Sequence, residues 1–316
     1  MVTTLVCLLL ILSLFLLITI IEYYMKISII SPAGFADYKK ESQGLAFLNS
    51  LGYEVIMPGI RLEPEMWTAG DARQRAKQLE DAWCQESLDI IFAARGGFGC
   101  IHLLEWLDWA RMSQYKKILC GHSDLSILHL AFLKKGLQST VSGVMPAVEL
   151  AEKEVDNLTK NSLLASLSFQ LPNIDAVIQQ ATIIKKGSCQ GRLIPVTLSV
   201  LCSLLGTDYF PDLSGDVLVL EDVNEKPYRL DAYLSQLQLC GVLNGVGGLI
   251  FADFSNCGNQ KELTYLFEKF SLFVEGPVIS GLPFGHCLPR LSLPVGLEVE
   301  FRVEEKITMK SLLQTF

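Results

Sequence analysis

The sequence is short of positive charge, of histidine and of closely spaced cysteines. Its 316 residues include 26 lysines and arginines against 34 aspartates and glutamates, a formal net charge of −8. Proteins that neutralise phosphate backbones concentrate positive charge, so this balance argues against a nucleic-acid partner. Nine cysteines occur, and successive ones never lie closer than 13 residues. That spacing excludes a CxxC zinc site and a dense disulfide framework, and it favours buried cysteines in a reducing compartment.

The first 24 residues contain a long apolar run and no charge before Glu22. Seventeen residues, 5–21, are interrupted by Ser13 and Thr19 alone. At about 1.5 Å per residue, this run barely spans a hydrocarbon core of about 30 Å. A secretory signal would need a basic start and a small-residue cleavage site, and the sequence has neither. Residues 1–24 are therefore interpreted as a membrane anchor or as an extended start before Met25.

The first lysines follow this run, so the positive-inside rule would leave the folded part of an anchored chain in the cytoplasm. Any membrane contact is expected to involve residues 1–24 only. From Met25 onward, short apolar runs alternate with helical patterns, which is typical of strand–helix–strand units in a mainly parallel sheet.

Two sets of such elements are predicted. The first set has strands at 27–30, 53–57, 88–93 and 117–120 and helices at 39–51, 71–85 and 125–134. The second has strands at 216–221, 248–252, 277–280 and 297–302, helices at 230–239 and 260–270, and a part-helical segment at 192–205. We predict an α/β fold with an N-terminal parallel-sheet domain, a weakly patterned linker and a C-terminal mixed α/β domain, at residues 25–150, 151–186 and 187–316.

A glycine-rich segment follows the predicted strand 88–93. Ligands bind at the carboxyl ends of strands in open α/β sheets, and residues 95–99 read Arg-Gly-Gly-Phe-Gly. Three glycines let the backbone approach a ligand and turn N–H groups inward, as an oxyanion or carboxylate site requires. A plain strand-to-helix turn fits the same residues. The segment lacks the glycine spacing of GxGxxG and P-loop motifs, which argues against a phosphate-binding site.

Ser123 follows the predicted strand 117–120 and begins a helix. A sharp strand–turn–helix holds a side-chain oxygen out of the sheet, and the helix N-terminus supplies N–H groups for developing negative charge. The local sequence Gly-His-Ser-Asp lacks the second glycine of a GxSxG elbow. Serine is also a favoured helix N-cap. Ser123 is therefore either a nucleophile or a cap.

A nucleophile needs a base, and the chain has four histidines. His102 and His129 fall in helical patterns, and His122 is expected to point elsewhere from a tight turn. His286 lies in a glycine-bracketed loop after the predicted strand 277–280, and is the best candidate base. Glu221, at the end of a strand, could orient an imidazole as the acid of a triad.

Two other acids, Asp222 and Glu225, compete with Glu221 for that role, and periodicity does not separate the three.

Several motifs occur together in the order found in LD-carboxypeptidases, a serine peptidase family that also includes the microcin C self-immunity peptidases. The chain resembles that family from Met25 to about Arg302. The matching segments are 95–99, 103–108, 117–124, 204–207, 220–225, 227–231 and 281–286. In one place the chain departs from the family: Pro195-Val196-Thr197-Leu198 stands where members usually have Gly-Gly-Asn-Leu. This departure puts the choice of peptide in doubt.

The resemblance implies a Ser123, His286 and Glu221 triad, with the backbone N–H groups of Gly97 and Asp124 forming the oxyanion hole. Arg95 and Gly96 are assigned to substrate binding. The family pairs an N-terminal domain resembling class I glutamine amidotransferases with a C-terminal domain, and is usually homodimeric. No metal or cofactor is implied.

The activity implied is hydrolysis of the bond before the terminal D-alanine of a murein tetrapeptide, in cytoplasmic cell-wall recycling. The alternatives are a microcin-type self-immunity peptidase and a catalytically silent muropeptide-binding protein.

Overall fold

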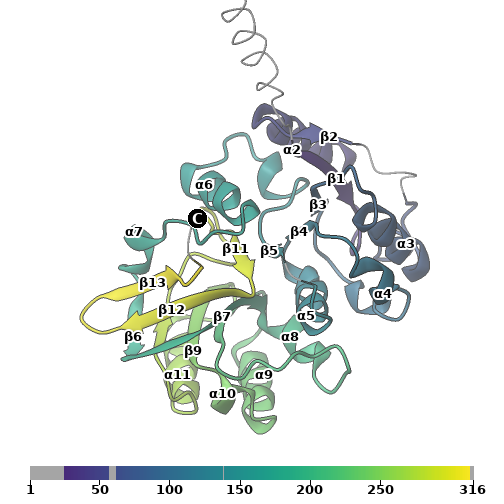
Figure 1. The fold of residues 1–316 in the computed structure, drawn as a ribbon. Helices are drawn as coiled ribbons and strands as arrows, with labels where there is room; N and C mark the ends of the chain where they lie inside the picture. Colours follow the sequence, from purple (N-terminus) through teal and green to yellow (C-terminus); the bar gives the residue numbers. More distant parts are fainter. Residues whose placement is uncertain (1–24, 57–61, 138, 314–316) are drawn as a thin grey trace, which may run out of the picture.

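The computed structural model describes residues 25–56, 62–137 and 139–313 and contains two β-sheets flanked by helices (Figure 1). The expectations for residues 1–24 and for residue 57 lie outside this described part. Among the described residues, no helix has the length and apolar character needed to cross a membrane. The fold is mixed α/β, with a largely parallel first sheet, as predicted.

The first sheet has six strands in the order β11-β5-β4-β3-β1-β2. Five pair in parallel: β1 (Lys26–Ile30), β2 (Glu54–Val55), β3 (Ile90–Ala93), β4 (Ile118–Gly121) and β5 (Thr140–Ser142). The sixth, β11 (Leu293–Val295), is antiparallel to β5 and comes from near the end of the chain (Figure 1). The sheet therefore combines early and late segments of the chain.

The helices of this half are α2 (Tyr38–Ser50), α3 (Ala72–Trp83), the single-turn α4 (Trp109–Met112) and α5 (Ser126–Lys134). Three short 3₁₀ turns accompany them: η1 (Cys100–Leu103), η2 (Ser123–Leu125) and η3 (Glu149–Ala151). Asp37 and Asp71 cap the first two helices by accepting backbone N–H groups, which fixes where those helices begin.

The second sheet has seven strands in the order β13-β12-β7-β8-β9-β10-β6. Its parallel centre is β7 (Gly187–Thr197), β8 (Val217–Val223), β9 (Gly248–Ser255) and β10 (Val278–Ser280). Antiparallel strands flank it: β6 (Thr182–Lys185), β12 (Leu297–Val303) and β13 (Ile307–Ser311). The surrounding helices are α8 (Leu198–Leu204), α9 (Pro227–Leu239), α10 (Val242–Gly245) and α11 (Gln260–Ser271).

Residues 151–186, which the sequence suggested were a connection, contain α6 (Asn157–Leu167), α7 (Asp175–Ile178) and strand β6. The segment 192–205 is helical only from Leu198, because its first part belongs to the long strand β7. One buried apolar cluster includes side chains of both halves, and α5 packs against α8 within it. The ends of β4 and β7, from which these helices start, are therefore held close together.

Candidate active site

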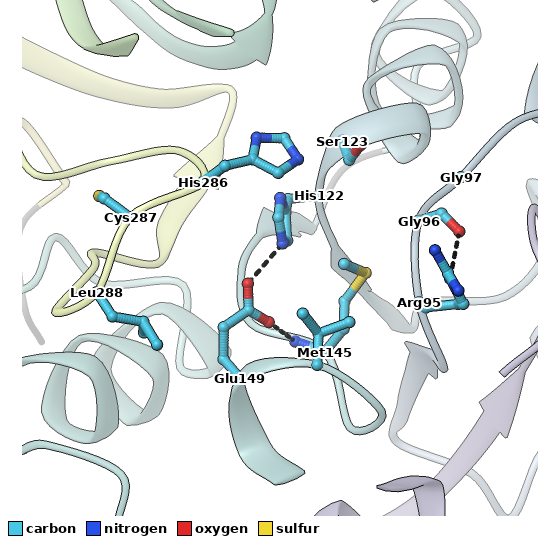
Figure 2. A pocket seen from close by; sticks show the side chains of 11 residues that line it. Arg95, Gly96, Gly97, His122, Ser123, Met145, Glu149, His286, Cys287 and Leu288 are labelled. Atoms are coloured by element: carbon cyan, nitrogen blue, oxygen red, sulfur yellow. Dashed lines mark hydrogen bonds and ion pairs between the residues drawn. The ribbon is translucent and has the colours of Figure 1, made fainter. Parts of the chain in front are cut away.

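A cavity of about 380 Å³ opens where loops of the two halves meet. Its lining combines the glycine loop (residues 95–99), the turn after β4, the segment before η3 and the base loop (residues 281–292). The lining residues are Arg95, Gly96, Gly97, His122, Ser123, Met145, Val148, Glu149, His286, Cys287 and Leu288 (Figure 2). The predicted nucleophile, base and glycine loop thus border one cavity.

Ser123 stands at the corner between β4 and α5, through the turn η2. Its φ of +64° lies in the left-handed region, where a residue with a Cβ is strained. Gly96 makes this corner possible, because a Cβ there would lie 2.8 Å from the Ser123 Cβ. The strained strand–turn–helix presents the serine side chain to the cavity, as a nucleophile elbow does (Figure 2).

Asp124 ties the glycine loop to the turn that carries Ser123. The Asp124 Oδ2 accepts the backbone N–H of Cys100 at 2.8 Å. Burial raises the pKa of the Asp124 carboxyl. Gly97, inside the loop, has a φ of +131°, and Gly34 donates its N–H to the carbonyl of Gly96 at 3.2 Å. The side chain of Asp124 therefore holds the end of the glycine loop beside the turn that carries Ser123.

His286 and Glu221 form a hydrogen-bonded pair across the base loop. His286 Nδ1 lies 2.7 Å from Glu221 Oε2, so a proton on Nδ1 is donated to the carboxylate. Gly285 has a φ of +129°, and a Cβ there would lie 2.7 Å from Glu221 Oε2. Glycine is thus required for the loop to pass over the acid. The other edge of the imidazole faces the cavity and Ser123 (Figure 2).

The electrostatics of this pair favour a charged imidazole and a charged carboxylate. Burial alone would raise the pKa of Glu221, but the hydrogen bond and charge of His286 and a hydroxyl hydrogen bond from Thr197 lower it below its ordinary value. Burial would lower the pKa of His286, but the hydrogen bond and charge of Glu221 raise it. The pair can therefore stabilise the imidazolium that forms when a base takes a proton.

The two competing acids lie in other environments. Asp222 is buried and accepts the backbone N–H of Ser199 at 2.8 Å, at the start of α8. Burial raises the pKa of Asp222 to about 6. Glu225 lies near Arg229 and accepts the hydroxyl of Tyr233. Of the three acids, Glu221 is the one that contacts His286.

The segment that departs from the family pattern supports the acid rather than lining the cavity. The described lining residues include none of positions 195–198. The Thr197 hydroxyl donates to Glu221 Oε1, and the Thr197 N–H donates to Ser126 Oγ at 3.1 Å. The hydroxyl contact holds the Glu221 oxygen that does not face His286. The N–H contact connects the end of β7 to the helix that follows Ser123.

The expectation that His122 points elsewhere was wrong. Its ring lines the cavity and meets the His286 ring edge to face, with centroids 4.9 Å apart (Figure 2). A carboxylate, Glu149, anchors it at 2.7 Å. Sequence reasoning missed this acid and its second partner, Arg290, because neither lies in a local motif. The other histidines lie apart: His129 is buried under β4, and His102 packs against Phe98 on the surface.

No group of three metal-ligating side chains occurs in the described part of the chain.

Comparisons with known proteins identify the family of the chain. Models of the N-terminal and C-terminal domains of LD-carboxypeptidases match residues 27–143 and 190–301. A probable murein peptide carboxypeptidase of Bacillus subtilis is 28% identical over 285 residues, covering 89% of both chains. The murein tetrapeptide carboxypeptidase of Pseudomonas aeruginosa is 31% identical over 238 residues, covering 73% of this chain and 78% of the relative.

Solved structures share the fold of this chain. The muramoyltetrapeptide carboxypeptidase of Oxalobacter formigenes superposes with a TM-score of 0.78 at 26% identity, covering 90% of this chain and 97% of that one. The microcin C7 self-immunity protein has a TM-score of 0.81 at 20% identity, covering 92% of this chain and 96% of that one, which shows a shared fold. With both domain models matched in order along the chain, the protein belongs to the LD-carboxypeptidase family, whose members are peptide hydrolases.

Proposed function

We propose that the protein is a serine-type LD-carboxypeptidase, which hydrolyses the bond before the terminal D-alanine of murein tetrapeptides during cell-wall recycling. The observation that carries this proposal is the hydrogen-bonded His286–Glu221 pair facing a strained Ser123 across one cavity. The named relatives that act on murein peptides support the substrate class.

The mechanism follows from the roles that this geometry permits. His286 Nε2 takes the proton of the Ser123 hydroxyl as the oxygen attacks the carbonyl carbon of the penultimate residue. The backbone N–H groups of Gly97 and Asp124 stabilise the oxyanion of the tetrahedral intermediate. Glu221 holds the imidazole in the required tautomer and stabilises its positive charge.

Collapse of this intermediate breaks the peptide bond, and His286 gives its proton to the departing amine of D-alanine. Water then attacks the acyl-enzyme with His286 again as base. The tripeptide leaves, and Ser123 regains its proton.

Arg95 is proposed to recognise the carboxylate of the terminal D-alanine. A carboxypeptidase must distinguish a chain end from an internal peptide bond, and a guanidinium pairs well with a carboxylate. Of the described residues that line the cavity, Arg95 alone carries a permanent positive charge. Its Nε donates to the carbonyl of Gly96 at 3.2 Å, which directs the guanidinium along the glycine loop (Figure 2). Gly96 is the expected backbone contact beside it.

The experiment is incubation of the purified protein with murein tetrapeptide, followed by mass analysis for tripeptide and D-alanine. The expected result is release of D-alanine, with none from the isomer that ends in L-alanine. Ser123→Ala is expected to bind the tetrapeptide without releasing D-alanine. Binding without turnover by the unmodified protein would instead indicate a silent muropeptide-binding protein. Cleavage of an aminoacyl sulfamoyl nucleotide in preference to the tetrapeptide would indicate a self-immunity peptidase.

We further propose a cytoplasmic homodimer. Light scattering of the purified protein would give twice the mass of one chain, and a monomer mass at micromolar concentration would contradict this part.

A further inference from the structure

A second acid–imidazole pair lies beside the first, and the proposed mechanism does not use it. His122 Nε2 and Glu149 Oε1 are 2.7 Å apart, and both side chains are buried. The ring of His122 meets the ring of His286 at an interplanar angle of 66° (Figure 2). Two imidazoles this close repel each other when both are charged, so they carry one proton more readily than two.

Glu149 is held from three sides. Its Oε1 accepts from His122 and from Arg290 Nη1, the latter at 3.0 Å, and its Oε2 accepts the backbone N–H of Met145 at 2.9 Å. Arg290 is fully buried and follows the candidate base by four residues in the chain. The network of His122, Glu149 and Arg290 therefore joins the turn of the nucleophile to the loop of the base.

Hydrogen-bond geometry sets the protonation of His122. The Glu149 carboxylate can only accept, so the proton of this contact sits on Nε2. The Nδ1 atom is buried and has no hydrogen-bond partner among the residues that the structure describes. Protonation there would bury an unpaired N–H and a charge beside Arg290, which is costly. In agreement, burial and the Arg290 charge lower the pKa of His122 to about 4.

His286 has the opposite surroundings. Its side chain is 23% exposed, its Nδ1 is paired with Glu221, and its other edge opens to the cavity. A proton on Nε2 therefore has the serine oxygen, the leaving amine or solvent as a partner. The charged and titratable groups around His286, from β8, the turn after β4, η3, its own loop and the facing glycine loop, are Glu221, His122, Glu149, Arg290, Cys287 and Arg95.

On the basis of the serine-peptidase function proposed above, we propose that His122 is a positioning residue for the general base. The His122–Glu149–Arg290 network holds a neutral imidazole against the edge of His286 and directs the catalytic proton to His286 alone. The negative charge of Glu149 favours a proton on His286, and the positive charge of Arg290 opposes it. The two charges therefore act in opposite directions on the pKa of His286.

The first test is a ring-NMR titration of the full chain labelled with ¹³C at the histidine rings, whose four histidines give few signals to assign. We expect His286 to titrate above about 6.5 and His122 to remain neutral from about pH 5 to 9. Glu149→Gln removes the anion and leaves the Arg290 cation, so the pKa of His286 should fall by roughly half a unit or more. Arg290→Met should shift it the opposite way.

Two further variants distinguish the effect of the buried charges on the pKa of His286 from any disturbance of the fold. Glu152→Gln removes an exposed acid three residues along the same turn, and should leave the titration unchanged. The double variant Glu149→Gln/Arg290→Met removes both buried charges, and should return the pKa of His286 to within about 0.3 of its original value. It also avoids an unpaired buried arginine, which could unfold the single variant.

A kinetic test uses His122→Phe, which keeps the ring shape and leaves Glu149 paired with Arg290 and the Met145 N–H. We expect kcat to fall about tenfold with KM within about twofold, since the ring acts on the base and not on substrate affinity. An unchanged kcat, a His122 that titrates together with His286, or a His286 pKa insensitive to Glu149→Gln and Arg290→Met would overturn the proposal. Because the NMR titration needs no turnover, absence of D-alanine release would count against the proposed function alone.

Discussion

Ser123 adopts a left-handed backbone conformation that disfavours any residue with a Cβ. Glycine would relieve this strain, while alanine would keep it. We therefore expect Ser123→Gly to raise the free energy of unfolding by about 0.5–1 kcal/mol relative to Ser123→Ala, after the entropic cost of glycine in the unfolded chain. Both variants should lose at least about 10³-fold in turnover. Urea unfolding and D-alanine release measure the two effects, and a glycine variant less stable than the alanine variant would refute stored strain.

Glu221 and Glu225 stand four residues apart and give opposite expectations. Glu221→Gln keeps the shape but loses the charge that stabilises the His286 imidazolium, so kcat should fall by about 10³–10⁴. Glu225→Gln alters a half-buried acid that contacts Tyr233, and turnover should stay within about threefold. Steady-state kinetics on the tetrapeptide would measure both losses. A larger loss of kcat in Glu225→Gln than in Glu221→Gln would show that Glu221 is not the acid that supports His286.

The raised pKa of His286 sets the direction of the pH dependence. The base must be neutral to accept the serine proton, and Glu221 holds its pKa above the ordinary value after offsetting the effect of burial. Activity should therefore rise with pH along a limb whose midpoint lies above about 6.5. A profile of kcat/KM against pH measures this midpoint. Full activity well below pH 6 would exclude His286 as the base.

The site residues differ in how far the sequence could predict them. Ser123, Glu221 and His286 each sit at a strand end or in a glycine-bracketed loop, which are positions that sequence patterns mark. Glu149 and Arg290 meet across 141 residues, and no local pattern records that pairing. The tight turn misled the expectation for His122, because the anchor that orients the ring lies 27 residues away.

At the level of elements, the sequence does not distinguish strand from helix in long apolar segments. Residues 192–205 are apolar throughout most of their length, and such a run does not distinguish a buried strand from a buried helix. The structure divides it between β7, which is buried at its end, and α8. Strand β11 has three residues and includes Pro294, and proline weakens a strand prediction. Its place is set by pairing with β5, which is a long-range contact.

The first described strand is β1, and the backbone N–H of its first residue already has a hydrogen-bond partner. The Lys26 N–H donates to Asp89 Oδ2 at 2.7 Å, and β1 lies between β2 and β3. We therefore expect a chain shortened to begin at Met25 to express in soluble form and to keep kcat within about twofold. Its midpoint of thermal unfolding should match that of the full chain within a few degrees. An insoluble or inactive product would show that residues 1–24 contribute to the folded structure.

At the scale of the whole molecule, the base loop connects the two sheets. It begins after β10, a strand of the second sheet, and ends at β11, a strand of the first. Ser123 follows a strand of the first sheet, and Glu221 lies in a strand of the second. The relative placement of the two sheets therefore sets the positions of the candidate triad, and two features hold that placement: the packing of α5 against α8 and the pairing of β11 with β5. A division of the sequence into consecutive domains could not predict this crossing.

The stability of the whole fold should depend on His129, which lies in α5 directly under the nucleophile turn. Its Nε2 contacts the carbonyl of Gly121 at 2.8 Å, and burial lowers its pKa to about 4. Between about pH 6.5 and 4 the unfolded chain therefore binds a proton at this site that the native state does not. The free energy of unfolding must fall on acidification across that window, by up to about 3 kcal/mol from this residue. Buried His122 acts in the same direction.

His129→Gln keeps a donor for the Gly121 carbonyl and removes the titration. Urea unfolding at pH 7 and at pH 4.5 should show a loss of stability on acidification that is smaller by about 2 kcal/mol in this variant than in the unmodified protein. His102→Gln, which changes an exposed histidine, should keep the full loss. Glu221 and Glu149, carboxylates with lowered pKa values, also reduce stability on acidification, but they are present in all three proteins and affect them alike. If the free energy of unfolding falls equally on acidification in the His129 and His102 variants, the proton taken up on unfolding binds at a residue other than His129.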